Sequence, residues 1–452
     1  MQEIYNYIEA NYEEAVADLA LFCRQPSVSA QGTGLAETAS LLARIMDKYG
    51  VKPRIMPLPS GGYPVVYGEL EGASPVTLLF YNHYDVQPAE PLELWTTPPF
   101  EPDLRQERIW ARGVSDNKGD IIARLLAFKA FLEVKGHVPV SVKFVVEGEE
   151  EIGSPNLPPF IRENRDLLEA DACLWEGGEV NYEGQPVIIL GVKGILYVQL
   201  EAVGARRDLH SSLAPIVPNP AWRMVWALAS LKDADERVLI DGFYDDARPP
   251  TPGELSAVRA IPPEDEKLKE GLGLKEMLRG AEGFELRSRL MLEPACTICG
   301  IISGYTGRGT KTVLPAVSRA KVDFRLVPNQ RPDDILSKLR RHLDRYGFGD
   351  ISISRDVEGE NPARTPPDSP FVGLVSTSAR EVYGLEPVIM PNMAGSGPMF
   401  FFIDTLGLPV ASSGVAHPES RAHAPDENIR LRDFVNNAKH IATILDKLAA
   451  GP

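Results

Sequence analysis

The sequence predicts an α/β protein in which helices cover a sheet and the chain is interrupted by an inserted α+β unit. Strand-like and helix-like segments alternate over residues 1–190. The pattern changes after residue 190, where strands and helices lie in a charge-rich block. Alternation resumes after a Pro-rich segment at 364–370, which is typical of a linker. Two consecutive domains followed by a tail would fit the same order, but insertion is the interpretation we favour.

The first part is expected to begin with two helices and to continue with a series of strands that one further helix interrupts. Apolar residues recur at helical spacing from Ile4 to Leu21, and Pro26 ends this helix. A second helix is expected over 35–49, before Gly50. Short apolar runs predict strands. A longer segment with helical periodicity, between the strands expected at 76–81 and 140–146, predicts a helix over 119–134. The expected strands are 63–69, 76–81, 140–146 and the short run 172–175.

The inserted block and the C-terminal part have their own elements. Within the block, Asn219-Pro220 opens a helix, with Asn as the N-cap and Pro in the first turn. Residues 232–296 are rich in charge, Pro and Gly, and no element is assigned there. The other expected elements are 191–203, 297–303 and 317–327 (strands), 332–346 (helix), and 371–383, 408–412 and 431–449 (renewed alternation). The predicted boundaries are 1–190, 191–364 and 365–452.

Composition excludes several function classes. The 452 residues include 47 Lys and Arg against 63 Asp and Glu, so the net charge of −16 argues against a nucleic-acid partner. No apolar run approaches the roughly 18 residues of a membrane span, and the acidic N-terminus lacks the layout of a signal peptide. Four cysteines are too few for a disulfide scaffold, so a cytoplasmic location is expected.

Polar residues follow several of the expected strands. His83 and Asp85 follow the run 76–81, and four glutamates, Glu147, Glu149, Glu150 and Glu151, follow 140–146. Glu176 follows 172–175, Asp116 precedes the helix at 119, and His423 lies in a polar loop after 408–412. Individually, these residues could be a turn-bound histidine, a helix cap or a solvated charge run.

Together they predict a site at the carboxyl edge of the sheet, where open α/β sheets bind ligands. Imidazole and carboxylate groups suit zinc and similar divalent ions. A carboxylate such as Asp116 could bridge two ions, and a second Glu beside a liganding Glu could act as a base toward water.

Three motifs make a resemblance visible: NHYDVQP (82–88), RGVSDNKG (112–119) and EGEEEIGS (147–154). In this order and spacing, the chain resembles the dinuclear-zinc metallopeptidases that include carnosinase-like dipeptidases, aminoacylases, carboxypeptidase G and succinyl-diaminopimelate desuccinylases. It is most similar to the carnosinase-like dipeptidases. The resemblance implies a mixed-sheet catalytic domain made of 1–190 and 365–452, with a lid and dimerisation domain at 191–364.

The resemblance also implies roles for the candidate residues. His83 and Glu176 would bind one metal ion, Glu151 and His423 the other, and Asp116 would bridge them. Asp85 would orient His83, and Glu150 would be the general base. The Asp116–Asn117 peptide bond would be cis. His417 could compete for the last ligand role, but the family's last His precedes a short polar stretch ending in Glu, as His423 precedes Glu427.

In the inserted block, the resemblance implies residues that bind substrate. His210, in RRDLHSS (206–212), would reach into the active site of a partner subunit and stabilise the oxyanion. Arg325, in DFRLVPN (323–329), would bind the substrate's terminal carboxylate. Thr312, in GTKTVLP (309–315), and the pair Gly395 and Ser396 would contact substrate as well.

The expected activity is hydrolysis of the amide bond of dipeptides or short peptides with a free C-terminal carboxylate, by a metal-bound water that Glu150 activates. The expected cofactors are two divalent ions, zinc or else manganese or cobalt. The alternative is an N-acyl-amino-acid deacylase or a carboxypeptidase, because Glu176 stands where many dipeptidases of this family have Asp. The expected partners are the substrate and a second copy of the chain, and neither nucleic acid nor a membrane.

Overall fold

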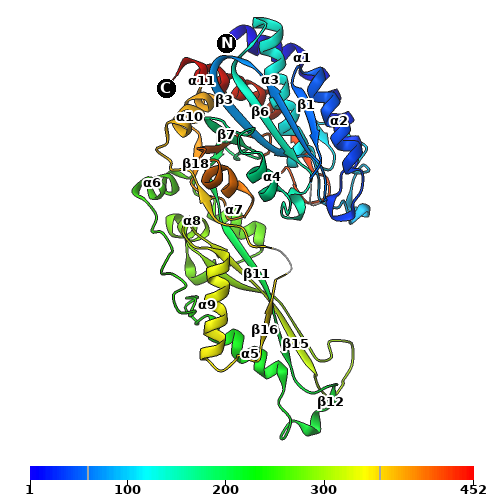
Figure 1. The fold of residues 1–452 in the computed structure, drawn as a ribbon, viewed down its shortest axis with the longest axis vertical. Helices are drawn as coiled ribbons and strands as arrows, with labels where there is room; N and C mark the ends of the chain where they lie inside the picture. The colour runs from blue at the N-terminus through cyan, green and yellow to red at the C-terminus, as the bar shows by residue number, and fades with distance from the viewer. Residues whose placement is uncertain (59–60, 356–357, 452) are drawn as a thin grey trace.

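The computed structural model describes residues 1–58, 61–355 and 358–451. A six-stranded mixed sheet, in the order β1-β2-β6-β3-β7-β19, forms the upper lobe in Figure 1. β3 runs parallel to β6 and β7, and β19 runs parallel to β7, whereas β1–β2 and β2–β6 are antiparallel. The strands are β1 (Lys52–Met56), β2 (Val65–Leu70), β3 (Gly72–His83), β6 (Val138–Glu147), β7 (Ala172–Trp175) and β19 (Val410–Ser412). The mixed sheet covered by helices is confirmed.

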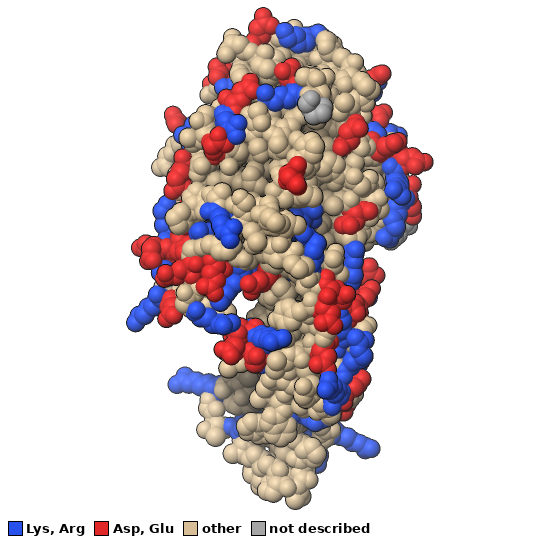
Figure 2. Space-filling view, turned by 90° about the vertical axis from the view of Figure 1, so that its left-hand side faces the viewer, with Lys and Arg blue, Asp and Glu red and all other residues tan. Residues whose placement is uncertain are grey.

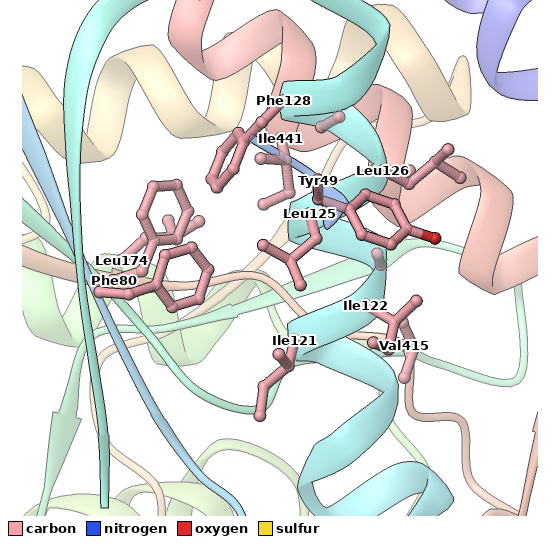
Figure 3. Packing of buried hydrophobic residues seen from close by; sticks show 14 of the residues in the cluster. Tyr49, Phe80, Ile121, Ile122, Leu125, Leu126, Phe128, Leu174, Val415 and Ile441 are labelled. Atoms are coloured by element: carbon pink, nitrogen blue, oxygen red, sulfur yellow. The ribbon is translucent and has the colours of Figure 1, made fainter. Parts of the chain in front are cut away.

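The core of this lobe lies between the sheet and its helices. Helix α3 is buried along most of its length because α1 and α11 pack against it. In Figure 3, Ile121, Leu125 and Phe128 of α3 lie beside Phe80 and Leu174 of the sheet. The helices of this lobe are α1 (Gln2–Arg24), α2 (Leu35–Lys48), α3 (Gly119–Lys135), α4 (Leu157–Glu163), α10 (Pro370–Tyr383) and α11 (Leu431–Ala450).

Short strands extend the same lobe. They pair as β4–β5–β20 and as β8–β9–β18. Their bounds are Asp103–Arg105 (β4), Arg108–Trp110 (β5), Glu179–Val180 (β8), Pro186–Ile189 (β9), Val388–Met390 (β18) and Asn428–Arg430 (β20). The sequence did not predict β1 or these strands. The strands of the two small sheets are too short to show an alternating apolar pattern, and β1 is mostly exposed, so its sequence carries no such pattern either.

A second, four-stranded sheet forms the lower lobe in Figure 1, which we call the lid. Its order is β13-β15-β11-β16, and every pair is antiparallel. Apolar side chains of β11 and β15 pack against α5 and α9 in a core of their own. The lid elements are β11 (Gly194–Val203), β12 (Leu209–His210), α5 (Pro220–Leu231), β13 (Ala295–Ser303), β14 (Val313–Leu314), β15 (Val317–Leu326), α9 (Pro332–Arg345) and β16 (Ser352–Ser354).

The chain leaves the six-stranded sheet after β7 and returns to it at β19. The four strands of the second sheet therefore lie, in sequence, between two strands that are neighbours in the first sheet. The outgoing and returning segments pair as the antiparallel strands β10 (Gly191–Val192) and β17 (Ala363–Arg364). The boundaries 190/191 and 364/365 themselves stay predictions.

The segment 232–296, left unassigned from the sequence, contains three short helices: α6 (Pro252–Ala260), α7 (Asp265–Leu272) and α8 (Gly283–Leu292). Thr251 and Glu254 form a capping box at the start of α6. Val258, Met291 and Leu292 form a small apolar cluster. Such short helices, separated by Pro and Gly, give little periodic signal. None of the helices within the described residues is long and apolar enough to cross a membrane.

Candidate metal centre

The candidate residues meet at the carboxyl edge of the parallel strands. His83 is the last residue of β3, and Glu176 directly follows β7. Glu150 and Glu151 lie in the turn after β6. Because β6, β3 and β7 are parallel neighbours, their carboxyl ends share one edge of the sheet. The run of glutamates is therefore not a solvated charge run.

Asp116 stands between two histidines. Its Oδ1 lies 2.9 Å from Nε2 of His83, and its Oδ2 lies 3.0 Å from Nε2 of His423. Asp116 precedes α3, and the Asp116–Asn117 peptide bond is cis, as expected. His423 comes from the loop between β19 and β20.

A second carboxylate accompanies each histidine. Nε2 of His83 lies 3.4 Å from Oε2 of Glu176, and Nε2 of His423 lies 3.2 Å from Oε2 of Glu151. Ligand atoms of His83, Asp116 and Glu151 all lie within 4.8 Å of one another. The arrangement is thus two histidine–carboxylate pairs joined by the two oxygens of Asp116.

The electrostatics of this cluster call for added positive charge. Burial raises the pKa of Glu176 well above its usual value. Burial disfavours a charged His83, but the charge of Glu176 and the hydrogen bonds that His83 donates to Asp116 and Asp85 outweigh this effect and raise the pKa of His83. Hydrogen bonds to Asp116 and Glu151 raise the pKa of His423 to about 10. Without other cations, protons on the two histidines balance the carboxylates.

Two buried oxygens test whether the residues fit metal ions. Oε1 of Glu151 and Oε2 of Glu176 have no hydrogen-bond partner within the described chain. A buried oxygen without a partner destabilises the folded protein, and a divalent cation bound at each carboxylate would provide that partner. The donor set, imidazole nitrogen and carboxylate oxygen, also suits zinc, manganese or cobalt. The residues present therefore fit divalent metal ions.

Asp85 connects the end of β3, which carries His83, to the turn that carries Glu150 and Glu151. Its side chain is fully buried and accepts hydrogen bonds from the backbone N–H of Glu150 (3.2 Å) and Glu151 (3.0 Å). Nδ1 of His83 donates to the backbone oxygen of Asp85 (3.0 Å) and lies 3.4 Å from its Oδ1. This contact keeps a proton on Nδ1, so Nε2, which faces Asp116 and Glu176, is the nitrogen that would offer its lone pair to a metal ion once it has lost its own proton.

Glu150 lies beside the cluster without pairing to either histidine. Burial, and then the charge of Glu176, raise the pKa of Glu150 well above its usual value. A Cβ placed on Gly397 would lie 4.0 Å from Oε1 of Glu150, so Gly397 lies beside this carboxylate.

The other two glutamates of the run are structural. Glu147 accepts hydrogen bonds from Tyr81 (2.6 Å) and Ser154 (2.8 Å), and burial raises its pKa to about 8. Glu149 accepts from the backbone N–H of Tyr63 (3.0 Å) and from Asn156 (2.8 Å).

Two supporting residues were not singled out from the sequence. Gln87 donates to Oε2 of Glu151 at 2.8 Å. The fully buried Glu427 accepts from Arg112 (2.8 Å) and from the backbone N–H of Gly113 (2.8 Å), Ser115 (2.8 Å) and Asp116 (3.0 Å). Gln87 lies in the motif NHYDVQP and Glu427 lies four residues after His423, so closeness in sequence to the candidate ligands was the available signal.

His417, the alternative to His423, lies outside the cluster. It is buried, its Nε2 lies 3.1 Å from Oδ1 of Asn428, and burial lowers its pKa to about 4.

The residues expected to bind substrate fall into two groups. Nη1 of Arg325 donates to Oγ of Ser396 at 2.9 Å, and Arg325 also pairs with Asp323. The backbone oxygen of Gly395 accepts from the N–H of Lys193 at 2.8 Å.

The other group is His210 and Thr312, whose Nε2 and Oγ1 lie 3.2 Å apart and are exposed. His210 belongs to β12, which lies at the lower end of Figure 1, far from β3, β6 and β7. One chain does not bring His210 to its own metal cluster.

Comparison with known proteins identifies the family. Residues 79–447 match the model of peptidase family M20/M25/M40. The chain belongs to this family. An M20 family metallo-carboxypeptidase, Sso-CP2 from Sulfolobus solfataricus, has the same fold, with a TM-score of 0.91 and 42% identity over 97% of this chain and 99% of that one. The resemblance drawn from the three motifs is confirmed.

Two relatives of this chain are dipeptidases by name. The Cys-Gly metallodipeptidase dug1 of Schizosaccharomyces pombe is 27% identical over 100% of this chain and 98% of its own. The human Beta-Ala-His dipeptidase is 25% identical over 99% of this chain and 93% of its own.

Proposed function

We propose that this M20 enzyme is a metal-dependent peptidase that hydrolyses the amide bond of dipeptides or short peptides with a free C-terminal carboxylate. The observation that carries this proposal is Asp116, whose two oxygens each face one histidine–carboxylate pair. Membership of the M20 family and the two dipeptidase relatives support it.

In this proposal, His83 and Glu176 would hold one divalent ion, Glu151 and His423 would hold the other, and Asp116 would be shared by both. Zinc is the metal we favour, with manganese or cobalt as alternatives. When bound, the ions supply Lewis acidity toward water and toward the scissile carbonyl. Gln87 and Asp85 keep Glu151 and His83 oriented toward the ions.

Glu150 acts as the general base. It lies in the turn that carries Glu151, and hydrogen bonds from its own backbone and that of Glu151 to Asp85 fix this turn. Glu150 takes a proton from the attacking water and then gives it to the nitrogen of the leaving amine. A buried carboxylate with a raised pKa suits both steps.

Arg325 binds the terminal carboxylate of the substrate. Its guanidinium extends from β15 of the lid to Ser396 in the upper lobe, so this contact joins the two lobes. A guanidinium offers two parallel donors to a carboxylate, and Ser396 and the backbone of Gly395 lie at the same place to assist.

We further propose that His210 and Thr312 act on the active site of a second copy, in a homodimer. Their exposed position at the far end of the lid supports action in trans. Apolar side chains are also exposed on α5 and on the edge strand β13, at Trp222, Trp226, Ile298, Ile301 and Ile302. Figure 2 shows few charged side chains at the lower end of the molecule, which suits a covered surface.

The cytoplasm is the proposed location. The four cysteines are free thiols, and three of them are buried, which fits a reducing compartment.

A carboxypeptidase or an N-acyl-amino-acid deacylase is the second candidate. The 42% identity with the metallo-carboxypeptidase Sso-CP2 favours it, as does the glutamate at position 176. Both activities use the same metal site and the same carboxylate contact at Arg325, so they differ in what lies on the amino side of the scissile bond.

One experiment separates the two. Purified enzyme, stripped with a chelator and reloaded with zinc or manganese, is assayed on dipeptides and on N-acetyl and N-blocked amino acids with the same C-terminal residue. Faster, metal-restored cleavage of free dipeptides is expected. Faster cleavage of the blocked series would make the enzyme a carboxypeptidase or deacylase, and no metal-dependent cleavage of either series would refute the proposal.

A further inference from the structure

Glu360 lines a cavity next to the turn that carries Glu150 and Glu151. The cavity, of about 500 Å³, lies between the two lobes. One wall is Ile152–Ser154, which directly follows Glu150 and Glu151, and the opposite wall includes Glu360. Pro398, next to the Gly397 that lies beside Glu150, also lines the cavity. Glu360 therefore lies across this cavity from the turn that follows the two glutamates of the metal cluster.

The backbone places Glu360 on the same face of the lid sheet as Arg325. Ile195 of β11 lies opposite Arg325 on one side and opposite Glu360 on the other. Two hydrogen bonds fix the second pairing, from Ile195 N–H to the Glu360 oxygen (2.9 Å) and back (3.0 Å). Side chains of directly opposed residues point to the same face, and the Cα atoms of Arg325 and Glu360 are therefore roughly 10 Å apart.

Among the residues that the structure describes, none forms an ion pair with the Glu360 carboxylate. Its Oε2 is buried and has no hydrogen-bond partner in the part of the chain that the structure describes. Burial raises the pKa of Glu360 to about 7, although Arg325 acts in the opposite direction. Of the basic residues lining the cavity, Arg355 is paired with Asp333 at 2.6 Å, and Arg162 is exposed.

We infer that Glu360 is a specificity-determining residue that selects substrates whose C-terminal residue carries a cationic side chain, such as lysine or arginine. The inference rests on the proposed function, in which Arg325 holds the C-terminal carboxylate. From a residue anchored there, the flexible four-carbon stem of a lysine spans much of the gap to Glu360. The ammonium would then satisfy the buried oxygen, and a neutral side chain of equal length would leave it without a partner.

The test compares kcat/KM for Ala-Lys, Ala-norleucine and Ala-Glu in the metal-loaded wild type and in Glu360→Gln. The wild type is expected to prefer lysine over norleucine, and Glu360→Gln to reduce this preference by roughly 10- to 100-fold. Glu358→Gln is the matched control, because Glu358 lines the same cavity but is exposed. It is expected to leave the lysine-to-norleucine ratio unchanged.

The ratio is insensitive to a loss of folded enzyme, which lowers both rates equally. An unchanged ratio in Glu360→Gln, or a wild-type preference for Ala-Glu, which would point to Arg162, overturns the inference while leaving the proposed function intact. Cleavage of none of the three peptides refutes the proposed function itself. If Glu360→Gln does not fold, product inhibition of the wild type decides: free lysine is expected to inhibit more strongly than norleucine, and equal inhibition overturns the inference.

Discussion

Glu427 offers the sharpest test of how the bridging loop is held. Its fully buried carboxylate accepts four hydrogen bonds, one from Arg112 and three from the backbone N–H groups of Gly113, Ser115 and Asp116. Arg112 is itself 1% exposed. Glu427→Gln keeps the size and shape of the side chain but removes its charge and replaces one acceptor with a donor.

The expected cost follows from these contacts. An amide cannot accept from all four donors, so at least one buried N–H group loses its partner and Arg112 loses its counter-ion. Breaking a buried ion pair costs about 3–5 kcal/mol, and the remaining contacts of Arg112, with the Pro88 oxygen (3.2 Å) and the Trp95 ring, favour the lower end of that range. Residues that position a metal ligand change metal affinity by roughly 10- to 100-fold, and Glu427 positions the backbone of Asp116.

The assay is zinc affinity by competition with a fluorescent chelator, together with urea unfolding of the metal-free protein. Glu419→Gln is the matched control, since Glu419 lies on the same loop and also pairs with an arginine, Arg108 (3.1 Å), but is exposed. A surface pair contributes at most about 1 kcal/mol. The reasoning is refuted if Glu427→Gln binds zinc and unfolds as Glu419→Gln does.

Three further predictions concern the proposed chemistry. Glu150→Ala should retain its metal, measured by elemental analysis, and lose roughly 100-fold or more in kcat; near-wild-type turnover would exclude Glu150 as the base. Mixed dimers of inactive His210→Ala and inactive Glu150→Ala chains should regain activity, and verified mixed dimers that stay inactive would count against action in trans. Because hydrogen bonds to Asp116 and Glu151 raise the pKa of His423 to about 10, this histidine is protonated at pH 7 in the metal-free protein and must release its proton to bind metal. Metal affinity should therefore rise with pH between about 6 and 9, with proton release detected by calorimetry in buffers of different ionisation enthalpy; a pH-independent affinity would contradict this.

Much of the fold could be predicted because its strongest elements are periodic or uniformly apolar. Helix α3 was expected over 119–134 and spans Gly119–Lys135, and the strand expected at 140–146 lies within β6, Val138–Glu147. The mostly exposed strand β1 and the helices α6–α8 escaped prediction, because a segment that buries few side chains carries no burial pattern in its sequence.

For the site, the sequence predicted the residue types and their positions at the ends of strands. The residues alone did not predict which glutamate of the run 147–151 takes which role. Nothing in EGEEEIGS distinguishes Glu147, which binds Tyr81 and Ser154, from Glu151, which faces His423. That distinction depends on which direction each side chain takes after the strand ends.

The sequence by itself determined the α/β class, the family, and which imidazole and carboxylate groups are available, because these depend on local periodicity and on short motifs. Only the tertiary structure decided which groups meet. It brings Asp116 to a histidine 307 residues away and pairs Arg325 with Ser396 across the two lobes. It also places Arg325 and Glu360 on either side of Ile195 in β11. These contacts depend on strand order, register and the return of the chain from the lid, and such long-range pairings leave no mark on the local sequence.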